Sequence, residues 1–210
     1  MVLFRINKII NLPENHSDPL VIGVGAHRAC YIHPEDPHKC IKVIYSQNDP
    51  VAPKEIRREL AYYKHLNSYL KDWTGMTRYY GTVETNLGTG YVYDRVMDFD
   101  GKISQTMKDR YRVENLKDNW KELKELVEKL EKYMWDNLII TMALKPHNVL
   151  CRRISENEII PVICDNVGTA TRIPVVFYSS WLCHRKQKKL FAKFEHQPLI
   201  QALRSYEQVR

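Results

Sequence analysis

Apolar residues in the first half of the chain form short runs that are bounded by glycine, proline and asparagine. Such runs predict β-strands that end at turns. The predicted strands span residues 20–22, 29–32, 40–45, 78–83 and 90–97. Between the third and fourth strands, apolar residues recur every three or four positions from residue 54 to residue 70, which predicts an amphipathic helix.

Helical spacing dominates the second half of the chain. The predicted helices span residues 116–135, 178–194 and 198–208, and a hairpin with its tip at 152–157 separates the first helix from the other two. Strands followed by helices are typical of an α+β fold. We therefore predict a β-rich N-lobe with one helix over residues 1–97 and a shortened, mainly helical C-lobe over residues 98–210.

The hydrophobic fraction of 44% and the charged fraction of 27% are those of a soluble globular protein. No apolar run reaches the roughly 18–20 residues that a membrane span requires, and the first eight residues do not resemble a secretory signal. The five cysteines are scattered without a Cys-x-x-Cys pair, so we expect free thiols rather than disulfides or a zinc site. These features predict a cytoplasmic protein.

The formal net charge is +7, and much of the excess lies near the C-terminus. Residues 181–210 contain seven Lys or Arg and two Glu. A basic surface can attract nucleic acid, an anionic lipid surface or an acidic partner. No nucleic-acid-binding motif accompanies the charge, so nucleic acid is not expected. Peripheral membrane contact and an acidic protein partner both stay open.

One segment of the second half resembles the catalytic loop of protein kinases. It reads Leu144-Lys145-Pro146-His147-Asn148 and is followed by a strand, a hairpin and a second strand that ends at Asp165. In kinases an Asn and an Asp so placed hold Mg²⁺ on the ATP phosphates. Asn148 and Asp165 are therefore the predicted metal ligands, and Lys145 is expected beside the transferred phosphoryl group. The alternative is that Asn148 caps a turn and Asp165 starts one.

Glycines and basic residues in the predicted N-lobe are candidates for further contacts to the ATP phosphates. Gly23 and Gly25 lie between two strands, where glycine lets the backbone approach a phosphate, and Arg28 adds positive charge. Lys42 interrupts an apolar strand, which predicts an anionic partner. In the alternative interpretation, the glycines form a plain turn and Lys42 faces solvent.

Two further positions complete the comparison with kinases. Glu59, on the first predicted helix, is the expected ion-pair partner of Lys42, with Glu55 as the alternative. Asp94 and Val96 lie in a segment that resembles a kinase hinge, where their backbone groups would bond the adenine edge.

The chain departs from kinases where the catalytic base is expected. Thr141-Met142-Ala143 stands in place of H-R-D, so Ala143 replaces the Asp that takes the proton of the acceptor hydroxyl. His147 or Asp165 could substitute. General-base assistance contributes about 10²–10⁴-fold, whereas phosphoryl transfer depends mainly on positioning and electrostatics. The sequence thus leaves open an atypical kinase and a pseudokinase that only binds nucleotide.

Several longer motifs occur together in this chain. They are Ile56-Arg57-Arg58-Glu59-Leu60, Gly81-Thr82-Val83-Glu84-Thr85, Gly88-Thr89-Gly90-Tyr91-Val92-Tyr93-Asp94, Asp98-Phe99-Asp100-Gly101 and Pro161-Val162-Ile163-Cys164-Asp165-Asn166. Over about residues 18–200 the chain resembles the bacterial family of PhoP regulatory network proteins called YrbL. The resemblance implies a cytoplasmic protein of Gram-negative bacteria that is associated with the magnesium- and acid-responsive PhoP regulon. It implies no particular reaction.

These residues together predict a two-lobed, protein-kinase-like α+β fold that binds ATP with Mg²⁺ or Mn²⁺ in the cleft between its lobes. The acceptor of a phosphoryl group, a protein or a small molecule, is not identified by the sequence. Two alternatives stay open. One is a non-catalytic interaction module that uses the basic C-terminal surface, and the other is a kinase for lipopolysaccharide core sugars or other small acceptors.

Overall fold

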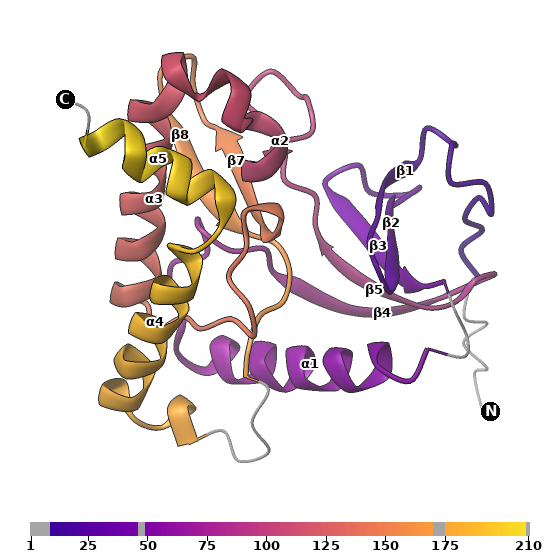
Figure 1. The fold of residues 1–210 in the computed structure, drawn as a ribbon. Coiled ribbons are helices and arrows are strands. Elements are labelled where there is room, and N and C mark those ends of the chain that lie inside the picture. The colour runs from indigo at the N-terminus through magenta and orange to yellow at the C-terminus, as the bar shows by residue number, and fades with distance from the viewer. Residues whose placement is uncertain (1–8, 46–48, 170–174, 209–210) are drawn as a thin grey trace, which may run out of the picture. The chain divides into compact units, whose positions relative to one another are not determined.

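The computed structural model describes residues 9–45, 49–169 and 175–208 (Figure 1). The chain forms two compact units, the first from Met1–Ile56 with Arg78–Arg95 and the second from Arg57–Thr77 with Val96–Arg210. The break after residue 95 falls beside the predicted boundary at residue 97. The first eight residues, for which no secretory signal was predicted, lie outside the described part of the chain.

The first unit is built on a five-stranded antiparallel sheet with the order β1-β2-β3-β5-β4. Its strands are β1 (Val21–Val24), β2 (Arg28–Ile32), β3 (Lys39–Ile44), β4 (Tyr79–Thr85) and β5 (Gly88–Asp94). Inward-facing apolar residues pack on one face of the sheet and form the core of this unit. They are Ile10, Leu12, Ala29, Tyr31, Ile41, Val43 and Val92.

Gly90 shows how closely the strands of this sheet pack against their neighbours. A Cβ atom at this position would lie 2.5 Å from Cγ2 of Ile41 on β3. Glycine is therefore required here by packing. Gly88, in the turn that joins β4 to β5, has a φ of +107°, which glycine adopts at little cost.

The second unit contains most of the helices and a three-stranded sheet of the order β6-β7-β8. The helices are α1 (Ala52–Tyr69, which begins in the first unit), α2 (Met107–Arg110), α3 (Leu116–Asp136), α4 (Ser180–Phe194) and α5 (Pro198–Gln208), and the strands are β6 (Gln105–Thr106), β7 (Val149–Arg153) and β8 (Ile159–Ile163). Single 3-10 turns span Val113–Asn115, Pro146–Asn148 and Val175–Phe177. Helix α3 packs against both α4 and α5 (Figure 1).

Residues 57–77 join the second unit because they contact the strands and loops of that unit. The backbone of Met76 bridges Ile163, and the amide of Thr77 donates to the carbonyl of Ile163 at 3.0 Å. On α1, the Tyr62 hydroxyl accepts a 2.8 Å hydrogen bond from the amide of Ile140. These contacts hold α1 against the loop that contains Ala143.

A buried polar side chain joins α4 to the end of α3. The amide nitrogen of Gln187 donates to the carbonyl oxygens of Met134 and Ile139, at 2.5 and 2.9 Å. The carbonyl of Met134 also accepts from the amide of Ile139 at 2.9 Å, so Gln187 ties α4 to a turn that is already closed by the backbone at the end of α3. Within the described residues, no helix combines the length and the apolar character that crossing a bilayer requires.

The predicted helices are confirmed with boundaries that shift by two residues at most. The five strands of the first unit and the hairpin around residues 152–157 are confirmed as well. The prediction missed β6 and α2, because two and four residues are too few to show a period in the sequence.

Candidate functional site

Strands β7 and β8 bring Asn148 and the residues before Asp165 together. Val149, the first residue of β7, pairs with Ile163, the last residue of β8. Just beyond this pair, the amide of Cys164 donates to the carbonyl oxygen of Asn148 at 3.0 Å. Asn148 and Asp165 therefore leave the same end of the hairpin.

The side chain of Asn148 is oriented by the loop that precedes it. It is 4% exposed, and its Nδ2 donates to the carbonyl oxygen of Ala143 at 3.4 Å. Because Nδ2 makes this contact, Oδ1 is the side-chain atom with which Asn148 would act as the predicted metal ligand. An amide oxygen is one of the hard donors that Mg²⁺ prefers.

Asp165 is positioned by the turn that follows it. Its Oδ1 accepts a 2.9 Å hydrogen bond from the amide of Asn166, which has a φ of +59°. Asparagine tolerates this left-handed conformation better than most residues. The carbonyl of Asn166 then accepts from the amide of Met142 at 2.7 Å, so the turn is tied to the loop that carries Ala143.

The pKa of His147 depends on its burial and on the charges around it. Burial lowers the pKa of His147, the positive charges of Lys145 and Lys108 lower it further, and the carboxylate of Asp165 opposes them. Lys145 and Asp165 therefore both lie within electrostatic reach of the imidazole.

Tyr63 links Glu59 to the same region of the second unit. Burial raises the pKa of Tyr63 well above its usual value, and the carboxylates of Glu59 and Asp165 raise it further. The Tyr63 hydroxyl also lies 3.3 Å from Oγ1 of Thr77. The second unit thus gathers Glu59 and Asp165 around one buried tyrosine. Tyr63 was not predicted as a site residue from the sequence, although it lies one helical turn after Glu59 and therefore on the same helix face.

Ala143 occupies the position at which kinases carry the catalytic Asp, and its methyl group has no acid–base chemistry. The chain around it is nevertheless held in place. Thr141 forms an isolated antiparallel β-bridge with Val167, and the amide of Gly168 donates to the carbonyl of Ile140 at 3.1 Å. Gly168 has a φ of +101°, and a Cβ there would lie 3.1 Å from Cβ of Tyr62. The loop is ordered by backbone contacts although the base is absent.

In the first unit, Gly23 lies in β1, where it pairs with Cys30 on β2, and Gly25 lies in the turn between β1 and β2. The amide of Gly25 donates to the carbonyl of Arg28 at 2.8 Å, and the hydroxyl of Tyr45 donates to the carbonyl of Ala26 at 2.7 Å. A Cβ at Gly23 would meet no atom within 4 Å. The fold of this unit therefore does not itself demand glycine at position 23.

Lys42 lies in the middle of β3, paired with Cys30 on β2 and with Tyr91 on β5. Its Nζ is 4.8 Å from the centroid of the Tyr93 ring. A cation over an aromatic face gains an attraction that partly offsets its removal from water. The strand and the ring together fix the position of the ammonium group within this unit.

The predicted hinge residues already bond to neighbouring groups. In the first unit, the backbone amide of Asp94 donates to the carbonyl oxygen of Arg78 at 3.2 Å. The carboxylate of Asp94 accepts from the backbone amide of Arg78 and from the hydroxyl of Tyr80. In the second unit, the carbonyl of Val96 accepts from the amide of Ser104 at 3.2 Å. The adenine contacts of Asp94 and Val96 stay a prediction.

Acid is expected to destabilise the native state in two steps. The pKa values of His65 and His147 are lowered, mainly by burial, so the unfolded chain binds protons that the native state does not as pH falls below about 6.5. The lowered pKa values of Asp49 and Glu207 act only near pH 4 and below. Urea unfolding at pH 7.5, 6.0 and 5.0 should show falling stability, with a smaller fall in the double variant His65→Gln/His147→Gln. An equal fall in both proteins would contradict the assignment.

Comparison with known proteins finds one matching family and close relatives in two bacteria. The family model "PhoP regulatory network protein YrbL" matches residues 12–199. The YrbL proteins of Escherichia coli (strain K12) and Shigella flexneri are each 50% identical to the chain over 184 residues, which cover 88% of this chain and 87% of each relative.

A solved structure of the protein kinase Rad53, residues 1–466 in complex with AMP-PNP, matches 92% of this chain and 52% of that one. The TM-score is 0.53 and the sequence identity is 16%, so the match concerns the fold. The mixed α/β architecture is therefore kinase-like, as predicted. The 50% identity over most of both chains and the family match over residues 12–199 show that the protein belongs to the YrbL family of PhoP regulatory network proteins.

Proposed function

We propose that this protein binds Mg–ATP and transfers the γ-phosphoryl group slowly to a hydroxyl acceptor. The observation that carries the proposal is the placement of Asn148 and Asp165 at one end of the β7–β8 hairpin, with Lys145 in electrostatic reach of the same region. The kinase-like fold and the complex of Rad53 with AMP-PNP support it by analogy.

The donor set fits a magnesium ion. Asn148 offers an amide oxygen and Asp165 a carboxylate, and both are hard ligands. Two protein ligands suffice, because Mg²⁺ takes its remaining ligands from phosphate oxygens and water. When bound, the ion would neutralise the charge that develops on the phosphates during transfer.

Further residues predicted from the sequence are assigned to the nucleotide in this proposal. Lys42 is assigned to the α- and β-phosphates, and Glu59 is assigned to orient its ammonium group. The backbone at Gly23 and Gly25 would approach the phosphates, with Arg28 adding charge. Lys145 would stabilise the charge on the transferred group.

The transfer step needs little covalent work from the protein. The bond between the γ-phosphorus and the bridging oxygen would break, a bond from the acceptor oxygen to phosphorus would form, and ADP would be the leaving group. The acceptor proton passes to water or to His147, whose lowered pKa keeps the imidazole neutral at pH 7. Without the Asp that Ala143 replaces, we expect a rate about 10²–10⁴-fold below that of a kinase with its base.

Thermal unfolding with ATP, in the presence and absence of Mg²⁺ or Mn²⁺, tests the binding proposal. We expect stabilisation by ATP that depends on the cation. Incubation with γ-labelled and α-labelled ATP then tests transfer. Label from the γ-position alone indicates phosphoryl transfer, label from the α-position indicates nucleotidyl transfer, and binding without either indicates a sensor. A protein indifferent to ATP would refute the whole proposal.

Gly23→Ala separates the glycine loop from the stability of the fold. Because a Cβ at this position meets no protein atom within 4 Å, the unliganded melting temperature should change little. If phosphates approach this backbone, the methyl group should weaken ATP binding by about tenfold, which is about 1.4 kcal/mol. Isothermal titration with Mg–ATP measures the change. Unaltered affinity would assign the glycines to a plain turn.

A further inference from the structure

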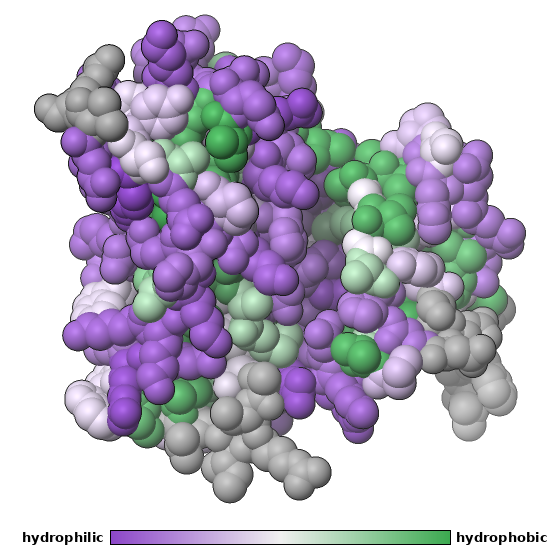
Figure 2. All heavy atoms as spheres, in the orientation of Figure 1, coloured by the Kyte–Doolittle hydropathy of each residue, from purple (hydrophilic) through white to green (hydrophobic). Residues whose placement is uncertain are grey.

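Helix α4 carries an uncompensated positive charge. Its 15 residues include Arg185, Lys186, Lys188, Lys189 and Lys193 and no acidic residue. Four of these cations, all except Lys186, are exposed. Figure 2 shows hydrophilic side chains covering this part of the second unit.

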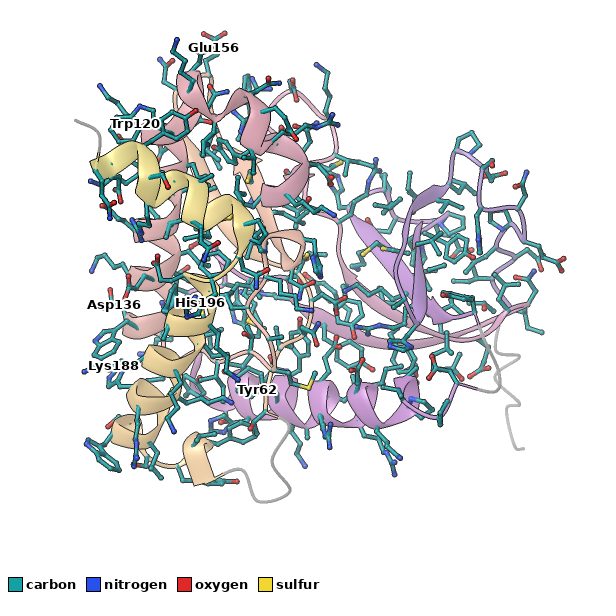
Figure 3. The ribbon with its side chains drawn as sticks, in the orientation of Figure 1. Tyr62, Trp120, Asp136, Glu156, Lys188 and His196 are labelled. Atoms are coloured by element: carbon teal, nitrogen blue, oxygen red, sulfur yellow. The ribbon has the colours of Figure 1, made fainter. Side chains whose placement is uncertain are left out.

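Several cations of the neighbouring helices α3 and α5 are paired, in contrast to those of α4. Arg204 on α5 bonds to Glu195 and Glu207, and Lys132 on α3 bonds to Asp136 at 2.7 Å. Within the described part of the chain, none of the five α4 cations forms an ion pair. Lys188 and Asp136 point outward on the same side of the second unit, and Asp136 is already neutralised by Lys132 (Figure 3).

Exposed indole rings are interleaved with these cations. Trp181, which is 66% exposed, lies 5.6 Å from the guanidinium carbon of Arg185. Trp135 at the end of α3 is 38% exposed, and the Nζ of Lys188 lies 5.8 Å from its ring. The His184 ring stacks on that of Trp135, with 3.7 Å between the ring centroids.

We propose that this surface, made by Trp135, Trp181, Arg185, Lys188 and Lys189, docks the protein on an anionic phospholipid bilayer. Tryptophan places its amphipathic ring at the boundary between headgroups and acyl chains. Clustered cations are attracted to the negative potential of anionic lipids. The inference goes beyond nucleotide binding and does not depend on it.

The kind of cation favours a diffuse anionic surface over a shaped partner. Arginine, whose planar fork binds phosphate in a fixed geometry, is the residue preferred for recognising a single phosphorylated group. Among the cations of this surface only Arg185 has that geometry, and Lys188 and Lys189 carry the flexible ammonium of lysine. Lysines respond to the sum of nearby negative charge rather than to one oriented group.

The opposite face of α4 keeps the helix in the folded protein during docking. Cys183, Leu190 and Phe194 are buried, and Gln187 is bonded to the end of α3. The proposed contact is therefore peripheral, made by side chains on the outer face of a helix that stays packed.

Vesicle co-sedimentation tests the proposal with the full chain. The probes are vesicles of pure phosphatidylcholine and vesicles with about one third phosphatidylglycerol. We expect binding to the anionic vesicles only, weakened by salt as for other electrostatic contacts. The variant Arg185→Glu/Lys189→Glu should bind at least tenfold more weakly, and Trp181→Ala several-fold more weakly.

The matched control is Lys117→Glu/Lys121→Glu on α3. It changes the same charge at the same four-residue spacing, both lysines are exposed, and Lys121 also lies over an indole, that of Trp120. This control should keep most of the vesicle binding, and the melting temperature of each variant shows that it is folded. An equal loss in the control would overturn the proposal, as would equal binding to neutral vesicles. Binding to heparin or RNA without binding to anionic vesicles would assign the surface to another polyanion and also overturn it.

Discussion

We expect Asp165→Ala to remove the stabilisation that Mg–ATP would give to the native protein under the proposed function. At a ligand concentration of 100 times Kd, a bound ligand stabilises by about 2.7 kcal/mol. Without the carboxylate, the proposed ion keeps only the Asn148 amide as a protein ligand. The triphosphate would then bind the second unit without the positive charge of that ion. We therefore expect the cation-dependent part of the thermal shift to fall to near zero, with a loss of affinity of about 100-fold or more.

Two variants separate this loss from a change in the fold. Asp165→Asn keeps an oxygen for the hydrogen bond from the Asn166 amide, so the turn should persist while the charge is removed. Asp136→Ala removes an exposed aspartate from the surface pair with Lys132, and such pairs contribute little, so ATP binding should be unaffected. A full Mg²⁺-dependent shift in Asp165→Ala and Asp165→Asn would show that Asp165 is not a metal ligand.

Phe194→Ala is expected to cost about 3–5 kcal/mol of unfolding free energy. The Phe194 side chain is fully buried at the end of α4 and meets the Phe191 ring edge to face at 6.2 Å between centroids. Removing the ring leaves a cavity beside the helices that pack on α3, and the melting temperature should fall by roughly 10 °C. Urea unfolding followed by circular dichroism measures the change.

Phe99→Ala is the control with the same chemical change. Its ring is 48% exposed and lies 4.7 Å from the guanidinium carbon of Arg153, so truncation should cost less than about 1 kcal/mol. Similar losses in the two variants would mean that α4 does not close the core of the second unit.

The sequence was most predictive where one physical pattern extended over many residues. Helix α3 has six buried apolar residues along one stripe, and its period alone places it within a residue of its observed end. The β7–β8 hairpin was equally accessible, because two apolar strands flank a charged tip. The register was not predicted: Arg152 and Arg153, expected at the tip, belong to β7, and Val149 pairs with Ile163.

The sequence was least predictive where function depends on backbone groups or on contacts between distant segments. The hydrogen bonds of Asp94 and Val96 arise from sheet and loop partners that residue identity does not specify. The charge of Asp165 acts on Tyr63 because α1 lies close to the segment around Gly168, about a hundred positions later. Residues 57–77 belong to the second unit for the same reason, and a linear pass along the chain assigns them to the first.

Cys164 gives the protein a native chemical reporter beside the proposed metal ligands. It precedes Asp165 directly, and its Sγ lies 3.4 Å from the carbonyl oxygen of Asn148. Burial raises the pKa of the Cys151 thiol to about 12 and that of Cys183 to about 11, so these two remain protonated and slow to alkylate at neutral pH. If a triphosphate binds as proposed, it would shield residue 164, and peptide mapping after a brief iodoacetamide pulse would follow that protection without any introduced label.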